Sequence, residues 1–563
     1  MKKVAETLPL ISDHSADKQF TGSKSMLFPA LFTVAFIACV LISVTPLVRL
    51  VGITTYPLPT NHFLTRFGGW LPTDLGLTSN ANASQTSTHS ILFILLMAVA
   101  FVIYGLFAWF IQRQYAQHQS RSLLVWIWIG AVIAGGVFVI TPAMLSHDIF
   151  VYASYGRIIE AHHANPYFVP LIHFPQDYFI AYDDWRKAVS AYGPIWLAIC
   201  AIFSPIIGDN LTRAILIYRL FAFAAHLINI LLVTNILRTM GRSERTVVLG
   251  TLLYAWNPLA LEESSLGAHN DVFMVMLILI GILFSVRIEQ NTTLQLRDYL
   301  PSLIAFTLAT LIKFTAAPLV VLSLVMLARK TLYPKSDATH PQRPQWKAGL
   351  RMVIPASLIS GALALAIYAP YWIGHSVGDI LYSFVAPPSS YLSYGSIHRA
   401  IIDWLQKYGL PPANSWSYIP MQILSSHDIW SKINLVTLTL LMIVGMIWLW
   451  RSPTTRTLIL ATLVVLGALL IVTPWFFPWY IIWLVGLAAV CLPVKYDRVG
   501  RALLIAALVF SASSLMIYPY HQEKAPIGPW IGFTFLTTIG PAIAAILLFL
   551  LLPMTKESKA SLT

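Results

Sequence analysis

The side chains best suited to chemistry are concentrated in the segment 146–167. His147 and Asp148 stand near its start, and Tyr152 and Arg157 follow. Apolar and aromatic residues recur there at helical spacing, which predicts a short amphipathic helix that begins at Asp148. The Asp148 carboxylate is either a helix cap, a position that favours aspartate, or a general base that takes a proton from a hydroxyl group. One residue can fill both roles, so both interpretations stay open.

A second polar cluster lies further along the chain. Two adjacent carboxylates, Glu262 and Glu263, are followed closely by His269, Asn270 and Asp271. Such groups are unfavourable next to a bilayer unless they are satisfied. A structural network that caps the next helix through Asn270 or Asp271 would satisfy them. We favour contact with a substrate or a phosphate group, because the cluster has no local basic partner.

Other candidates stand singly between apolar runs. Lys313 either extends its side chain to the membrane surface or binds an anionic lipid phosphate. Arg399, next to His398, is placed at the same level of the membrane. Tyr192 precedes a Gly-Pro pair, and Tyr480 closes an aromatic run. Aromatic residues at this level are commonly interface anchors, which is the favoured interpretation for each of these two taken alone.

Several common sites are absent from the sequence. There is no glycine-rich phosphate loop, no Cys and His spacing typical of a metal site, and no Asp-x-Asp motif. The three cysteines, Cys39, Cys200 and Cys491, all lie inside apolar stretches, so no disulfide framework is indicated. We therefore expect no metal and no cofactor.

The composition indicates a membrane protein. The 563 residues are 57% hydrophobic and only 10% charged, and the mean hydropathy is +0.71. Soluble domains carry roughly 25% charged residues, so a deficit this large implies that much of the surface faces lipid. The net charge of +13 does not indicate a nucleic acid partner, because the basic residues fall between apolar runs, where they set topology.

The apolar runs predict an all-α polytopic fold with about fourteen transmembrane helices, since a spanning helix needs about 20 apolar residues. The predicted spans are 26–47, 91–111, 123–140, 211–237, 247–261, 271–284, two within 301–329, 353–373, 435–450, 458–472, 481–492, 502–517 and 530–552. The two helices in 301–329 are expected to meet at Lys313 and Pro318. The run 194–207 is short and bounded by proline, so we expect a helix lying in the outer interface.

The basic residues predict the orientation. With the N-terminus in the cytoplasm, 24 of the 36 Lys and Arg residues fall on inner segments and 9 on outer ones, in agreement with the positive-inside rule. The acidic residues show the opposite bias, with 14 of 23 outside. We therefore expect a cytoplasmic tail at 1–25, a polytopic domain at 26–553 and a cytoplasmic tail at 554–563. Long outer segments at 48–90, 141–210 and 374–433 place the working surface outside.

The order of the short motifs resembles a known family. The motifs are Asp148-Ile-Phe-Val-Tyr-Ala-Ser-Tyr-Gly-Arg157, Asn165-Pro-Tyr167, Tyr192-Gly-Pro194, Asn257-Pro258, His269-Asn-Asp271 and Lys313. Together they are similar to the GT-C superfamily of glycosyltransferases, and in particular to bacterial polyprenol-phosphate-mannose-dependent alpha-mannosyltransferases. The resemblance covers about residues 120–330 by motif and the rest of the chain by topology.

The resemblance implies a GT-C-like fold in the bacterial plasma membrane, a polyprenyl-phosphate sugar donor, and a glycan or lipoglycan acceptor. Transfer would occur on the outer face, without a nucleotide and with inversion at the anomeric carbon. It implies that Asp148 is the base. It also implies that Lys313, His398 and Arg399 bind the donor phosphate, and that Glu262, His269, Asn270 and Asp271 shape the sugar pocket. The other candidate substrate-binding residues are His147, Tyr152, Arg157, Tyr192 and Tyr480.

Two other classes of protein are alternatives. A transporter or a flippase of a lipid-linked saccharide should show ionisable residues near the middle of its spans and broken helices in matched halves. In this sequence the ionisable residues cluster at one face. A non-catalytic membrane scaffold would leave the acidic outer clusters without a role.

The predicted orientation can be tested by cysteine labelling in intact cells. A cysteine in the loop 329–351, such as Gln342→Cys, should be shielded from an impermeant reagent, because positively charged loops stay in the cytoplasm. Cysteines placed in 374–433 should react and serve as the matched control. Labelling of Gln342→Cys from outside would reverse the orientation.

Overall fold

The computed structural model of the chain describes residues 27–51, 83–114, 120–289, 294–334, 343–492, 497–518 and 534–551. All regular structure within these ranges is helical, apart from an isolated bridge between Tyr394 and Trp475. The predicted tails 1–25 and 554–563, and most of the predicted outer segment 48–90, lie outside the described residues.

Nine helices in the described ranges are long and apolar enough to cross a membrane. They are α1 (Leu27–Val51), α3 (Ala83–Gln114), α4 (Ser120–Ile140), α7 (Leu211–Thr239), α10 (Asp271–Glu289), α12 (Ala317–Leu332) with the turn η6 (Phe314–Ala316) before it, α13 (Trp346–Trp372), α17 (His427–Arg451) and α18 (Thr455–Val472). The prediction of an all-helical polytopic membrane protein is confirmed. Among these nine helices α10 is the most buried, whereas α13 and α17 lie at the periphery.

The other predicted spans correspond to shorter helices. They are α8 (Glu244–Ala255) with α9 (Pro258–Ser265), α11 (Leu296–Ile312), α19 (Ile482–Val490) with the turn η8 (Pro478–Ile481), α20 (Arg498–Ser514), and α23 (Gly540–Leu551) with the π-helical turn η9 (Phe535–Ile539). The predicted span 247–261 is thus divided in two. Pro258 cannot continue a helix from its N-terminal side, and Asn257 caps the new helix by accepting a hydrogen bond from the Ala260 amide at 3.0 Å.

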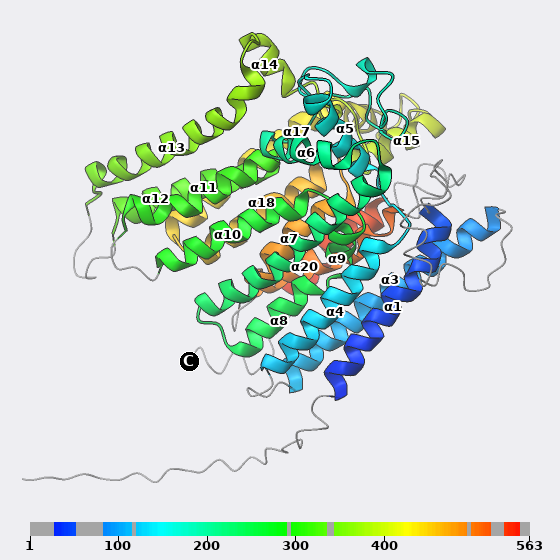
Figure 1. Cartoon of the computed structure of the whole chain (residues 1–563). Coiled ribbons are helices and arrows are strands. Elements are labelled where there is room, and N and C mark those ends of the chain that lie inside the picture. The colour runs from blue at the N-terminus through cyan, green and yellow to red at the C-terminus, as the bar shows by residue number, and fades with distance from the viewer. Residues whose placement is uncertain are drawn as a thin grey trace, which may run out of the picture.

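Short helices gather at one end of the bundle, where Figure 1 shows α5 (Asp148–Glu160), α6 (Pro194–Ile207), α14 (Val377–Ser383) and α15 (Ile397–Tyr408). The helices predicted at 148 and at 194–207 are both present. The first is not one-sided as predicted, however. Ten of the 13 residues of α5 are buried, because α6 and α7 pack against it. Packing by neighbouring helices therefore covers the face that was expected to meet the membrane surface.

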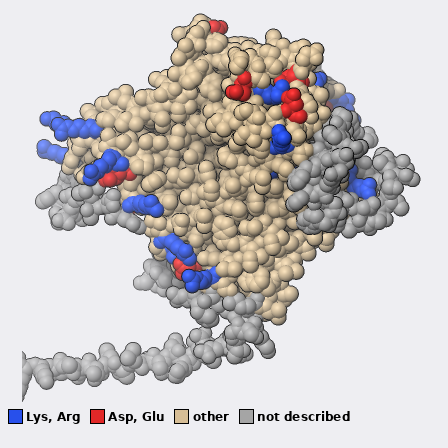
Figure 2. Space-filling model, viewed as in Figure 1, with Lys and Arg blue, Asp and Glu red and all other residues tan. Residues whose placement is uncertain are grey.

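Charged side chains lie at the two ends of the bundle. Figure 2 shows a broad band without charged residues across the visible face, with Lys and Arg along the lower-left edge and most acidic residues near the top. Large apolar side chains are exposed along this part of the molecule, including Val34 at 62% and Leu358 at 66%. A soluble protein rarely exposes so continuous an apolar surface, so the band is suited to lipid.

The buried side chain of Trp256 joins several helices of the bundle. Its ring stacks on Phe36 of α1 with centroids 4.7 Å apart, and its Nε1 donates a hydrogen bond to the Ile127 carbonyl of α4 at 2.8 Å. Gly130 leaves room for it, since a Cβ atom there would lie 2.3 Å from the indole. This contact fixes the end of α8 just before the chain turns into α9.

Arg219 in α7 is wholly buried and binds only backbone carbonyls in the described structure. Its Nε donates to Leu266 at 2.9 Å, its Nη1 to Val139 at 3.1 Å and Thr141 at 2.7 Å, and its Nη2 to Ala143 at 2.5 Å. Val139 lies in the last turn of α4, and Thr141 and Ala143 lie in the chain that leads from α4 to α5. The fourth lies in the loop between α9 and α10. One side chain therefore ties together the two segments that lead to Asp148 and His269.

Replacing Arg219 with methionine should destabilise the protein strongly. Methionine has a similar length but no donors, and each buried carbonyl left without a donor costs about 1–3 kcal/mol. We expect a loss of at least about 3 kcal/mol in the free energy of unfolding, measured by denaturant titration in detergent. Arg213→Met is the matched control, because Arg213 lies exposed on the same helix and should change stability by less than about 0.5 kcal/mol. Equal stability of the two variants would contradict the structural role of Arg219.

Candidate active site

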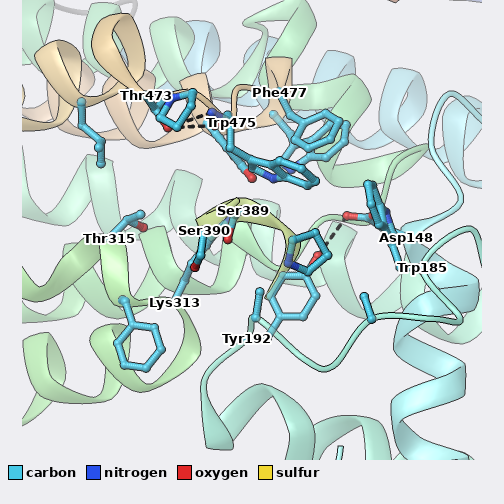
Figure 3. Close-up of a pocket in the computed structure, with 18 of the residues that line it drawn as sticks. Asp148, Trp185, Tyr192, Lys313, Thr315, Ser389, Ser390, Thr473, Trp475 and Phe477 are labelled. Carbon is cyan, nitrogen blue, oxygen red and sulfur yellow. Dashed lines mark hydrogen bonds between the residues drawn. The ribbon is translucent and has the colours of Figure 1, made fainter. Parts of the chain in front are cut away.

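A cavity of about 460 Å³ lies at the end of the bundle where α5 begins. One wall comes from Asp148 of α5, the segment 185–192, and Lys313 with the turn after it. The rest of the lining comes from residues 388–390, from α17 and α18, and from the aromatic segment 473–483. Figure 3 shows Asp148 toward one end of the cavity and Lys313 with Thr315 toward the other. The cavity thus joins a carboxylate and an ammonium group.

Asp148 is the first residue of α5 and does not cap it. The N-cap position is held by His147, whose side chain makes no capping bond. The Asp148 carboxylate instead accepts hydrogen bonds from the hydroxyls of Tyr192 at 3.2 Å and Tyr152 at 3.4 Å. It also lies 3.4 Å from Nδ1 of His269. The capping interpretation of Asp148 is therefore wrong, because its side chain faces the cavity and not the helix amides.

The surroundings of Asp148 favour its ionised form. Burial alone raises the pKa of a carboxyl group, but here the hydrogen bond and charge of His269, the charge of Lys313 and the hydrogen bond from Tyr192 outweigh burial and lower the pKa of Asp148. A carboxylate that is ionised and opens on a cavity can accept a proton from a bound hydroxyl group.

Tyr192 is held in place by the Gly-Pro pair that follows it. Gly193 donates its amide hydrogen to the Ile312 carbonyl at 2.9 Å, and Pro194 begins α6. A Cβ atom on Gly193 would lie 2.0 Å from the Leu311 carbonyl oxygen. Only glycine allows this approach, which brings the Tyr192 segment against the end of α11.

Lys313 occupies the break between α11 and η6 that the sequence predicted. Its Nζ lies 2.8 Å from Oδ1 of Asp271 and 4.0 Å from the centre of the Tyr480 ring. Trp483 donates to the same Asp271 oxygen at 2.6 Å. The Lys313 side chain is only 12% exposed, so it does not extend toward the membrane surface. The acidic cluster has no basic partner nearby in the sequence, and the structure supplies one in Lys313, 42 residues after Asp271.

A second, smaller cavity of about 220 Å³ lies on the other side of Asp148. His147 lines it and pairs with Asp184 through Nδ1 at 2.7 Å. Asp148, Trp185 and Trp479 line both cavities. The carboxylate is therefore accessible from two sides.

Among the described residues no group of three His, Cys, Asp or Glu side chains is arranged to hold a metal ion.

Comparison with known proteins finds a family match for the part of the chain that carries Asp148 and Lys313. Residues 62–329 match the model of the MptA/B family, described as alpha-(1->6)-mannopyranosyltransferase, N-terminal domain. These residues are similar to that family. The resemblance seen in the sequence is thereby confirmed for the matched residues.

Individual relatives are distant. A probable alpha-(1->6)-mannopyranosyltransferase of Mycolicibacterium smegmatis is 25% identical over 208 residues, which are 36% of this chain and 34% of the relative. Alpha-(1->6)-mannopyranosyltransferase A of Corynebacterium glutamicum is 20% identical over 225 residues, 40% of this chain and 42% of the relative. An alpha-(1->6)-mannopyranosyltransferase of Mycobacterium tuberculosis is 26% identical over 153 residues, 26% of this chain and 25% of the relative. The chain thus aligns with less than half of each of these relatives. No solved structure matches.

Within the family region, the structure brings together most of the candidate site residues. Asp148, Tyr192 and Lys313 line the larger cavity, joined by Tyr480 from outside the matched residues. Tyr152 and Asp271 contact these residues, and the Tyr152 hydroxyl also accepts a long hydrogen bond of 3.5 Å from the Asn270 amide. His269 is fully buried behind Asp148 and lines neither cavity. It therefore contacts the Asp148 carboxylate and neither cavity.

Four other candidates lie away from both cavities. Arg157 lies nine residues after Asp148, about 14 Å along α5. It pairs with Asp177 and Asp209 at 2.7 Å each. His398 is buried in contact with Ser393 and Trp430. Arg399 pairs with Asp403 of its own helix at 2.6 Å. Glu262 is completely buried, and neither of its carboxylate oxygens has a hydrogen-bond partner.

The sequence did not single out several residues that form the site. Trp185 and Trp479 line both cavities, and Ser389 and Ser390 line the larger one. The segment 474–480 was interpreted as a membrane belt. Its backbone instead pairs with Tyr394, whose amide donates to the Pro474 carbonyl at 2.9 Å. That pairing closes the cavity, and no local sequence pattern indicates it.

Proposed function

We propose that this chain is a membrane-embedded, inverting glycosyltransferase that transfers mannose from a polyprenyl-phosphate donor to a lipid-linked glycan or lipoglycan acceptor. The MptA/B family match over 62–329 supports mannose and an alpha-(1->6) linkage. The observation that carries the proposal is the larger cavity, which has an ionised carboxylate and a buried ammonium group on its walls. Such a pair supplies both parts of an inverting transfer, a base for the acceptor and a cation for the leaving phosphate.

The donor phosphate binds at Lys313 in this proposal. A lysine ammonium carries three N–H donors, and Asp271 takes one of them at 2.8 Å. Another part of the ammonium faces the Tyr480 ring, which leaves capacity for a phosphate oxygen in the cavity. The prenyl chain extends along Phe314, Leu469 and Leu470, which give the same cavity an apolar wall.

The acceptor enters on the side of the smaller cavity. The rings of Tyr394, Phe477 and Trp479 line that cavity, and aromatic faces with a few polar groups are typical of small-molecule sites. Its polar groups include the His147–Asp184 pair. From there an acceptor hydroxyl reaches Asp148, which opens on both cavities.

The reaction is a single displacement. Asp148 takes the proton of the acceptor hydroxyl while the acceptor oxygen forms a bond to C1 of mannose. The bond from C1 to the phosphate oxygen breaks, and the electron pair stays on the polyprenyl phosphate. Its additional negative charge develops beside Lys313. Attack from the face opposite the leaving group inverts the configuration at C1, and no metal or nucleotide takes part.

The proposed setting is the outer face of the bacterial plasma membrane. In this arrangement both tails, 1–25 and 554–563, lie in the cytoplasm. About fourteen crossings form the GT-C-like domain 26–553, in which the shorter helices α8, α11, α19, α20 and α23 complete the nine long ones. The basic fringe at the end of the bundle opposite the cavity supports this orientation.

A transporter or flippase is the alternative class, and it calls for ionisable groups within the spans. Arg219 and His226 lie in the span formed by α7. Arg219 is bound to four backbone carbonyls. His226 stacks on Tyr254 with ring centroids 4.9 Å apart. Both are accounted for by packing, so they favour the enzyme over the transporter.

The change Asp148→Asn tests the role of the base. Asparagine keeps the shape of the side chain but has no charge to accept a proton. We expect normal membrane insertion and donor binding, with the rate of mannosyl transfer lowered by about two to four orders of magnitude. The assay measures transfer from radiolabelled polyprenyl-phosphate-mannose to a lipoglycan acceptor by purified protein. Asp403→Asn is the matched control and should keep its activity, because Asp403 pairs with Arg399 outside the cavities. Near-normal transfer by Asp148→Asn would overturn the assignment.

Lys313→Ala tests the phosphate contact. Without the ammonium group the apparent donor KM should rise by about tenfold or more, and Lys313→Arg should restore part of the affinity because charge is retained. The single change leaves Asp271 buried and without its cation, so the double variant Lys313→Ala/Asp271→Asn separates folding from binding. It should fold like the wild type and still bind donor weakly. Lys432→Ala, which removes an exposed lysine of α17, should leave the donor KM unchanged. The proposed contact is wrong if the double variant shows a wild-type donor KM.

A further inference from the structure

His269 lies between two carboxylates in the buried region behind the cavity. Its Nδ1 is 3.4 Å from Asp148 and its Nε2 is 3.3 Å from Glu263. His269 and Glu263 are completely buried, and neither lines a cavity. We call these three residues the carboxylate–histidine chain. It begins at the cavity with Asp148 and extends into the protein.

The backbone around His269 is built to allow this arrangement. Ala268 has a positive φ of 55°, a left-handed conformation that non-glycine residues rarely adopt. A Cβ atom on Gly267 would lie 2.6 Å from Oε2 of Glu263 and 2.7 Å from the His269 ring. The turn therefore carries strain at one residue and needs glycine at the next. Strain of this kind persists where the surrounding structure fixes it, often at functional sites.

Side chains on the other sides hold the histidine and the glutamate still. The ring of Trp479 stacks on His269 with centroids 3.8 Å apart and planes 10° apart. Glu263 accepts a hydrogen bond from the Tyr518 hydroxyl. Its neighbour Glu262 is equally buried but has no hydrogen-bond partner. Glu263 differs from it in two contacts: Tyr518 donates to its Oε1, and its Oε2 lies 3.3 Å from Nε2 of His269 in an ion pair without hydrogen-bond geometry.

Resting on the function proposed above, we propose that Glu263 is a positioning residue for the transfer reaction. It acts through His269, holding the imidazole ring as a cation between two carboxylates so that Asp148 stays ionised and directed at the acceptor. His269 is thus a positioning residue and not a sugar ligand. The sequence had placed it in the sugar pocket.

The charges around His269 support this role. Burial alone lowers the pKa of an imidazole, but the nearby carboxylates of Asp148 and Glu263 outweigh burial and raise the pKa of His269 to about 9. The other charged or titratable groups of this region are Lys313 and Asp271 near Asp148, the hydroxyls of Tyr152 and Tyr192 on Asp148, and Glu262 and Tyr518 near Glu263. Burial and the charge of Glu263 raise the pKa of Glu262 well above its usual value, which favours its neutral form.

The imidazolium also balances the charge during transfer. Before the reaction it lies between two negative carboxylates. When Asp148 takes the acceptor proton, one of those negative charges is neutralised and the departing phosphate gains one near Lys313. His269 then keeps a single anionic partner, Glu263, and remains paired. Loss of the His269 proton would instead leave two buried carboxylates facing each other across a neutral ring, next to a donor that is itself an anion.

The test compares Glu263→Gln with Glu262→Gln, its matched control on the adjacent residue. In the wild type, kcat/KM for mannosyl transfer should fall on the alkaline side with a midpoint near pH 9, the pKa of His269. Glu263→Gln removes one of the two anions that hold the proton, so this midpoint should move down by at least about one pH unit, and kcat at pH 8.5 should fall about tenfold. Glu262→Gln should retain the wild-type profile. A wild-type alkaline midpoint in Glu263→Gln would overturn the proposal.

A second measurement does not depend on catalysis. Because the folded pKa of His269 lies above its unfolded value of 6.5, its contribution to stability is complete below about pH 6.5 and is lost as pH rises toward 9. The unfolding midpoint of the wild type should fall across this range more than that of Glu263→Gln, and Glu262→Gln should follow the wild type.

If the wild type transfers no mannose, the proposed function fails while this measurement still decides the carboxylate–histidine chain. If Glu263→Gln does not fold, Gly267→Ala should shift both midpoints in the same direction, because its Cβ displaces Glu263. An unchanged pH dependence in both measurements contradicts the proposal.

Discussion

The arrangement of the site depends on one buried guanidinium. Arg219 donates to four backbone carbonyls at or just beyond the C-terminal ends of α4 and α9, where helical donors run out. Near a bilayer, water is not available to replace it. Three of the carbonyls precede Asp148 by only a few residues, and the fourth precedes His269 by three. Asp148 and the histidine behind it are thus positioned by the same side chain, which lines neither cavity.

Local sequence patterns were sufficient for the elements that carry the site. The apolar runs predicted a helical polytopic protein, and the lone Lys313 and nearby Pro318 predicted the break between α11 and α12. The motif from Asp148 predicted a helix that starts at the right residue. These features depend on neighbours within a few positions, so helical spacing and proline chemistry contain the necessary information.

Long-range contacts could not be predicted in the same way. The partner of Lys313 is Asp271, 42 residues away, and that carboxylate is also bound by Trp483, 212 residues away. The chemical type of each residue was visible in the sequence, but its partner was not. Arg399 shows the same limit: the resemblance implied a phosphate ligand, and the sequence did not indicate its partner. That partner is Asp403, one helical turn further on.

The close approach at Gly193 has a mechanical consequence. The Gly193 amide donates a hydrogen bond to the carbonyl of Ile312, which directly precedes Lys313. Tyr192, which directly precedes Gly193, donates its hydroxyl hydrogen to Asp148. The path from the cation to the base therefore consists of covalent bonds and two hydrogen bonds, with no soft side-chain packing in series. This linkage sets the spacing between the two charged groups before any ligand binds. A displacement of the α11 terminus is transmitted to the carboxylate with little loss.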